Sequence, residues 1–320
     1  MIRVVLKFGG SSVGSAAAMR AAAAVVAATR RRERPAVVVS ALAGVTDELI
    51  AAVALAEAGD RAAFDRVARL RARHLAQLAE VVSPGRCEAS RRAADAIDEV
   101  LDGLVRRLDD VIRLRAAPPR VRAGLLAAGE RLAAPLFVGA LVAREIGAEV
   151  VEALDLLVVD GEALDGTPDV AASRPRALAR FAFLGEAVAV VPGFHGAGRD
   201  GEPRLLGRGG SDTAATVLGA ALGAGRIEIW TDVDGVAPAD PRRVADARPI
   251  ARMSYDRAEA LAASGAKVLH AKALAPAREA GIPVVVRNTF RPEAAGTWID
   301  APDPAPPPAP RARALAGGWA

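Results

Sequence analysis

The chain has 320 residues, of which 52% are hydrophobic and 25% charged, so it is long and apolar enough to bury a sizeable core and cannot be intrinsically disordered. Its single cysteine excludes an intrachain disulfide and a thiolate metal cluster. The net charge of +4 comes from arginines interleaved with carboxylates at helical spacing, and 3% of residues are aromatic, so we expect no nucleic-acid partner.

Short β-branched runs alternate with long Ala-, Leu- and Arg-rich stretches, which is typical of parallel strands joined by helical crossovers. The predicted fold class is therefore α/β with a mainly parallel central sheet. In chain order, the predicted strands are 3–8, 36–40, 149–154, 187–191, 226–231 and 283–288. The predicted helices are 15–32, 46–58, 61–82, 87–114, 120–146, 212–222 and 268–280. The two helices within 61–114 have no strand between them, which predicts a helical hairpin standing off the sheet.

A glycine-bearing loop, KFGGSSV, follows the first strand at residues 7–13. Glycine lets a backbone approach a ligand closely, and the amides that open a helix favour an anion, so this loop suits a phosphate. Lys7 precedes the glycines, which distinguishes the loop from GxxxxGK[ST]. Of the 42 basic residues the three lysines are Lys7, Lys267 and Lys272, so each lysine is expected to have a specific role. The alternative is a tight turn with a lysine that reaches the surface.

The stretch 190–215 is the most informative in the chain. It contains a GxGxxG pattern that begins at Gly196, but the pattern leads into EPRLL, an extended hairpin arm, and no helix follows at once as a dinucleotide site requires. The segment GRGGSDTAA then opens an Ala-rich helix. Arg208 offers a planar fork for a carboxylate or phosphate, and Asp212 either caps the helix or orders a metal or lysine beside a phosphate.

An acidic loop, TDVDGVAPADPRR, follows the strand at 226–231, and ligands of open α/β sheets bind at such carboxyl ends, although Asp, Gly and Pro also form ordinary turns. Lys7, Arg208, Arg242 and Lys267 would supply four cations for a polyphosphate. The histidines, His74, His195 and His270, are scattered without metal-ligand spacing, so we expect structural roles for them and no metal site made by the protein.

These motifs, in this order, resemble the amino-acid kinase family and within it the aspartate kinases. The resemblance covers residues 2–299 and includes KFGGSSV, VVVSALAGVTD, GERL, GFHG, LGRGGSDTAA, EIWTDVDGV, DPR and GAKVLH. It implies a three-layer α/β/α sandwich of the carbamate kinase-like type over residues 1–299. An N-terminal lobe, about 1–200, would bind the amino acid, and a C-terminal lobe, about 201–299, would bind ATP. The Pro- and Ala-rich stretch 300–320 is expected to be a disordered tail.

The resemblance also implies the reaction, which is phosphorylation of the side-chain carboxylate of L-aspartate by ATP carrying Mg²⁺. It assigns catalysis to Lys7 and Asp212. By the same resemblance, the substrate-binding residues are Thr46, Glu130, Phe194, Arg208 and Ser211, with Glu130 on the ammonium and Arg208 on the α-carboxylate. The ATP-binding residues that it implies are Lys7, Gly9, Gly10, Ser11, Thr231, Asp232, Arg242 and Lys267.

The chemistry of the residues agrees with this assignment. A carboxylate nucleophile is already deprotonated at neutral pH, so the reaction needs no general base and no catalytic histidine. The obstacle is repulsion between the carboxylate and the phosphates, which a lysine, backbone amides and Mg²⁺ relieve. Two residues depart from the family pattern, Ala237 in place of a bulky residue near the nucleotide and Ala271 in place of a proline.

Several expectations concern regulation and partners. Aspartate kinases continue into ACT regulatory domains, which this chain does not contain, so we expect no feedback inhibition by lysine or threonine within it. A homodimer and a separate ACT-domain subunit both remain open. No apolar run reaches the roughly 18 uninterrupted residues of a membrane span and no leader pattern is present, so we expect no membrane partner and a cytoplasmic location.

Two alternative functions stay open from the residues. An enzyme of the same fold would phosphorylate a different small acid. A non-catalytic nucleotide sensor would be expected to lack Lys7 or Asp212, and both are present.

Overall fold

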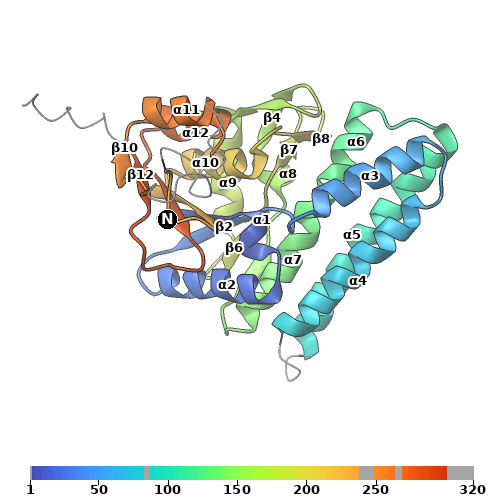
Figure 1. Cartoon of the computed structure of the whole chain (residues 1–320), viewed down its shortest axis with the longest axis horizontal. Helices are drawn as coiled ribbons and strands as arrows, with labels where there is room; N and C mark the ends of the chain where they lie inside the picture. Colours follow the sequence, from blue (N-terminus) through green and yellow to red (C-terminus); the bar gives the residue numbers. More distant parts are fainter. Residues whose placement is uncertain (1, 83–86, 238–247, 264–268, 301–320) are drawn as a thin grey trace, which may run out of the picture.

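A central sheet of eight strands organises the chain in the computed structural model, which describes residues 2–82, 87–237, 248–263 and 269–300 (Figure 1). The strand order is β10-β12-β11-β9-β1-β2-β6-β3, and every pairing is parallel except that of β11 with β12. The strands are β1 (Val4–Phe8), β2 (Pro35–Val39), β3 (Ala148–Val150), β6 (Val188–Pro192), β9 (Arg226–Thr231), β10 (Arg252–Met253), β11 (Val284–Asn288) and β12 (Thr297–Ile299). The predicted mainly parallel sheet is confirmed.

Helices cover both faces of this sheet, which gives the three layers that the resemblance implied (Figure 1). Side chains of β1 alternate between two cores, with Leu6 and Phe8 in one and Val5 in the other. The helices α2 (Ala16–Arg30) and α7 (Ala128–Val142) line the first core, and α9 (Val170–Ala182), α10 (Gly210–Leu222) and α12 (Ala271–Glu279) line the second. Because both faces are covered, most strand residues are apolar.

The predicted helical hairpin is present as α4 (Ala63–Val81) and α5 (Cys87–Leu114), which stand beside the layered body with α3 (Val45–Glu57) and α6 (Pro119–Leu126) (Figure 1). Leu101 and Leu108 of α5 are fully buried. On the solvent side, Arg71 of α4 pairs with Asp98 and Asp102 of α5 at 2.7 and 2.6 Å. The interleaved charges therefore form a solvated helical surface.

A second sheet has the order β5-β4-β7-β8. Its strands are β4 (Val158–Gly161), β5 (Gly166–Asp169), β7 (His195–Ala197) and β8 (Pro203–Leu205). The GxGxxG pattern lies in the antiparallel β7–β8 hairpin, as predicted from the extended EPRLL arm. A Cβ on Gly196 would lie 2.7 Å from the Leu157 carbonyl oxygen, so this glycine permits close packing between backbones.

Several element predictions were wrong or incomplete. The predicted strand 149–154 ends at Val150, because Ala153–Leu156 forms the short helix α8. The predicted helix 120–146 is interrupted at Ala127 and ends at Val142. The strands of the second sheet other than the hairpin arm were not predicted, because they are three or four residues long and rich in Gly, Asp and Pro. The helices α1 (Gly10–Val13), α9 and α11 (Tyr255–Ala263) and the short strands β10 and β12 were also missed.

One helical stretch, Pro119–Val142, has the length and apolar composition of a membrane span, but 83% of its most apolar window is buried inside the protein, as in a core helix. The predicted tail, from residue 301 onward, lies outside the described residues.

Candidate active site

Lys7 and Asp212 meet at the carboxyl edge of the central sheet. Lys7 follows Leu6 in β1, so strand alternation turns its side chain toward the α10 layer. Asp212 lies in the first turn of α10. The Lys7 Nζ lies 2.5 Å from Asp212 Oδ1, and the two side chains are 9% and 13% exposed. The structure therefore joins the two predicted catalytic residues in one buried ion pair.

The burial of the Lys7–Asp212 pair is better explained by a chemical role than by a contribution to folding stability. Taking two charges out of water costs several kcal/mol per ion, so a buried pair is often no more stable than apolar residues of the same volume. The pair also lies where ligands of open α/β sheets bind. A buried ammonium at that edge is available to a ligand that carries negative charge.

The predicted phosphate loop lies directly beside the ammonium. Gly9 is the N-cap of α1, and its amide donates to the Trp230 carbonyl at 3.0 Å. A Cβ on Gly9 would lie 3.5 Å from Lys7 Nζ, and one on Gly10 would lie 3.1 Å from the Ala41 carbonyl oxygen. Ser11 is exposed. The loop thus fits tightly between β9, the segment after β2 and the lysine.

Glu130 forms the other half of the site. It lies in the first turn of α7, is 4% exposed, and its Oε1 accepts a hydrogen bond from Ser211 Oγ at 3.1 Å. Its Oε2 is buried without a hydrogen-bond partner among the described residues. Burial raises the pKa of the Glu130 carboxyl to about 7, against the opposing effects of the Ala41 backbone, Ser211 and Lys7. A cationic ligand would supply the missing partner.

Close backbone contacts hold this pocket together. A Cβ on Gly193 would lie 2.8 Å from the Ser211 Cβ, and one on Gly210 would lie 2.6 Å from the Phe194 Cδ2. Phe194 itself adopts a positive φ of 71°. A Cβ on Gly129 would lie 2.9 Å from that of Ala41. The motif glycines therefore allow Phe194 and Ser211 to approach Glu130.

The remaining predicted substrate contacts are more open. Thr46 lies in the first turn of α3, half-buried, and Gly44 rather than Thr46 or Asp47 is the N-cap of this helix. Arg208 is exposed and lies between two glycines of positive φ. No hydrogen bond or ion pair joins Arg208 to another described residue.

The predicted nucleotide contacts lie at the end of β9. The Thr231 hydroxyl donates to Asp232 Oδ1 at 3.0 Å, and Asp232 is exposed. Asn288, at the end of the neighbouring β11, donates to Asp234 Oδ1 at 2.6 Å. Arg242 and Lys267 lie outside the described residues.

Residues 3–288 match the amino acid kinase family over most of the chain. The chain belongs to this family. Among curated relatives, this amino acid kinase is 35% identical over 304 residues to chloroplastic aspartokinase 3 of Arabidopsis thaliana, covering 92% of this chain and 52% of the relative. It is 33% identical over 299 residues to the lysine-sensitive aspartokinase 3 of Escherichia coli, covering 92% and 64%.

A solved structure agrees with these relatives. The crystal structure of E. coli aspartokinase III in complex with aspartate and ADP superposes with a TM-score of 0.84 at 33% identity, covering 95% of this amino acid kinase and 66% of that chain. The chain thus spans between about half and two thirds of the length of these three relatives.

Two of the three histidines of this amino acid kinase lie in its core. His74 and His195 are fully buried, and burial lowers the pKa of each imidazole to about 4, so both are neutral near pH 7. They are core residues, as expected. No group of three or more His, Cys, Asp or Glu side chains in the described part of the chain could hold a metal ion.

Sequence reasoning missed several contributors to the site. Ala41 and Gly129 shape the pocket of Glu130, and Trp230 and Thr289 bind the glycine loop through Ser12. Small or apolar residues carry no chemical signal of their own. The contacts of Trp230 and Thr289 follow from strand order, which places β9 beside β1 and β11 on the other side of β9.

Proposed function

We propose that this chain transfers the γ-phosphoryl group of MgATP to the side-chain carboxylate of L-aspartate, which forms 4-phospho-L-aspartate and ADP. The observation that carries the proposal is the buried Glu130 carboxylate close to the Lys7–Asp212 pair, with one oxygen that no described residue hydrogen-bonds. This arrangement suits a ligand that is cationic at one end and reacts with phosphate at the other. The similarity to aspartokinases supports the same activity.

Glu130 is proposed to bind the substrate ammonium. A bound ammonium would stabilise the ionised carboxylate and reverse the effect of burial on its pKa. Arg208, which is exposed, would turn its fork to the α-carboxylate. Thr46, Ser211 and the backbone of Phe194 would complete the pocket. An amino acid held at both of its polar groups then presents its side-chain carboxylate toward Lys7.

The transfer step needs positioning and charge stabilisation rather than proton removal. An aspartate side chain is ionised at neutral pH, so a carboxylate oxygen attacks the γ-phosphorus and the bond to the β,γ-bridging oxygen breaks. Lys7 would neutralise charge that develops on the transferred group, and Asp212 would hold the Lys7 ammonium in place. Mg²⁺, which arrives with ATP as part of the substrate, neutralises further phosphate charge.

ATP is proposed to contact the loop residues and the end of β9. Gly9, Gly10 and Ser11 would approach the phosphates, and Thr231 and Asp232 would contact the nucleoside. The same proposal includes Arg242 and Lys267. The product would be the first intermediate of the aspartate-derived amino-acid pathway, formed in the cytoplasm.

The test is a hydroxamate assay, which traps an acyl phosphate as it forms. Purified protein with MgATP is offered L-aspartate, D-aspartate, L-glutamate, N-acetyl-L-aspartate and succinate in parallel. We expect hydroxamate from L-aspartate and little from N-acetyl-L-aspartate or succinate, which lack the ammonium. Acyl phosphate from another acid and none from L-aspartate would overturn the proposal.

A further inference from the structure

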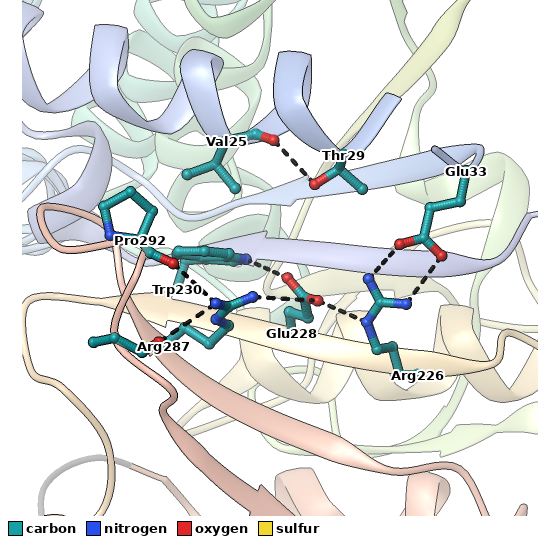
Figure 2. A network of polar contacts seen from close by, with 9 residues as sticks. Val25, Thr29, Glu33, Arg226, Glu228, Trp230, Arg287 and Pro292 are labelled. Atoms are coloured by element: carbon teal, nitrogen blue, oxygen red, sulfur yellow. Dashed lines mark hydrogen bonds and ion pairs between the residues drawn. The ribbon is translucent and has the colours of Figure 1, made fainter. Parts of the chain in front are cut away.

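A buried polar network lies on the face of the sheet opposite the Lys7 side chain, and the proposed reaction makes no direct use of it (Figure 2). Strand alternation in β9 directs Glu228 and Trp230 toward the α2 layer and Ile229 toward the α10 layer. Glu228 and Trp230 are 3% and 2% exposed. A carboxylate buried to this depth is costly unless it is paired and hydrogen-bonded, so its partners indicate its role.

Glu228 is fixed by three neighbours (Figure 2). The Trp230 indole Nε1 donates to its Oε2 at 3.0 Å, and Arg226 Nε donates to its Oε1 at 2.7 Å. Arg287 Nη1 of β11 lies 4.0 Å from the same Oε1. Arg226 is held in turn by Glu33, beyond the end of α2. The carboxylate is therefore a rigid acceptor for the indole N–H.

The Trp230 ring also packs against a guanidinium and another aromatic ring. The Arg287 guanidinium lies 4.9 Å from the ring centroid, and the Phe8 ring of β1 stacks at 6.3 Å. Phe8 stacks in turn on Phe137 of α7 at 5.3 Å. Arg287 donates to the Pro292 carbonyl at 2.9 Å, which adds the loop after β11 to the same unit (Figure 2). These contacts oppose displacement of the Trp230 ring.

The backbone of Trp230 connects this unit to the glycine loop. Its carbonyl accepts from the Gly9 amide at 3.0 Å and from Ser12 Oγ at 3.2 Å. Ser12 is fully buried, and its Oγ lies 2.7 Å from Thr289 Oγ1 beyond β11. A shift of Trp230 would therefore move the loop that packs against Lys7 Nζ.

We propose that Trp230 is a positioning residue for the glycine loop, residues 9–12. Held by Glu228 and Arg287, it keeps this loop beside the Lys7 ammonium and thereby determines the affinity for the nucleotide. The inference rests on the proposed function, because it takes MgATP as the ligand of that loop. Trp230 touches no reacting atom in this account. It acts through the Gly9 amide and Ser12 hydroxyl.

Steady-state kinetics of two variants separate this role from general structural support. Trp230→Phe keeps a stacking ring but loses the indole N–H, and Glu228→Gln keeps an acceptor but removes the charge between Arg226 and Arg287. We expect each to raise the KM for ATP about tenfold and to leave the KM for the acceptor within about twofold. Trp298→Phe, at a 38% exposed tryptophan of β12, is the matched control and should change neither. Equal changes in both KM values, or no change in either, would overturn the inference.

A fluorescence titration keeps the inference testable if those variants fold poorly. The chain has three tryptophans, so the double variant Trp298→Phe/Trp319→Phe retains Trp230 alone. Titration with a non-hydrolysable MgATP analogue should shift its emission, with a midpoint that matches the Kd from calorimetry. Binding by calorimetry without any emission change would overturn the positioning role and leave the proposed function standing. Absence of analogue binding to the wild-type protein would overturn both.

Discussion

The two halves of the candidate site differ in how completely they are built. On the acceptor side, Glu130 is buried, accepts from Ser211 and is enclosed by close glycine contacts. On the nucleotide side, Asp232 and Ser11 are exposed. The proposed acceptor side therefore keeps its carboxyl group in a desolvated pocket, whereas these residues of the proposed nucleotide side face water.

This difference indicates where each proposed substrate would obtain its binding energy. A buried carboxylate with one oxygen lacking a hydrogen-bond partner is destabilised in its ionised form, and the proposed substrate ammonium would remove that destabilisation. An exposed carboxylate or hydroxyl gains little from one new contact, because water already solvates it. Single changes should therefore have large effects near Lys7 and Glu130 and small effects at the exposed end of β9.

Lys7→Ala should cause the largest loss, because it removes the cation shared by the two halves. We expect kcat to fall by at least about a hundredfold, equivalent to roughly 3 kcal/mol of barrier. Initial rates in the hydroxamate assay measure the change. Arg180→Ala removes a cation from a half-buried 2.5 Å pair with Glu149, outside the candidate site, and should leave the rate unchanged. A Lys7→Ala rate close to wild type would contradict the assigned role.

Glu130→Gln tests the acceptor side alone. The amide keeps the shape and the Ser211 contact but cannot pair with an ammonium, so the KM for L-aspartate should rise roughly 30-fold. The KM for ATP should stay within about twofold. Glu149→Gln, at a surface carboxylate, is the control. A rise in the KM for ATP as large as that for aspartate would mean that the two sides are not separate.

The pH dependence of acceptor binding follows from the raised pKa of Glu130. In the free enzyme this carboxyl is protonated below its pKa of about 7 and cannot hold an ammonium, and it is ionised above that pH. The KM for L-aspartate should therefore be about tenfold higher at pH 6 than at pH 8. Glu130→Gln should abolish this dependence. A wild-type KM that is flat over this range would show that Glu130 is already ionised at pH 6.

Asp232→Asn should have the smallest effect, because this side chain is exposed and accepts a hydrogen bond from the neighbouring Thr231 hydroxyl. We expect the KM for ATP to rise about threefold, with kcat and the KM for the acceptor unchanged. Isothermal titration with the ATP analogue checks the same change at equilibrium. A loss as large as that of Glu130→Gln would remove the contrast between the two sides.

Much of the fold could be predicted from local pattern. Six strands of the central sheet were found because β-branched runs such as Pro35–Val39 are apolar throughout, as is typical of strands covered on both faces. The short strands of the second sheet were missed. Strands such as Gly166–Asp169 contain Gly, Pro and Asp, and their pairing partners, more than their own residues, make them strands.

The sequence by itself determined the chemical groups of the site, because lysine is scarce in this chain and its glycine motifs stand at strand ends. Only the tertiary structure decided which of these groups meet. Lys7 and Asp212 are 205 positions apart in the sequence, yet the packing of α10 against β1 brings Lys7 Nζ to 2.5 Å from Asp212 Oδ1. The same folding buries Glu130 and places Trp230 beneath the glycine loop. Burial and strand order are properties of the whole packed chain, so no local pattern contains them.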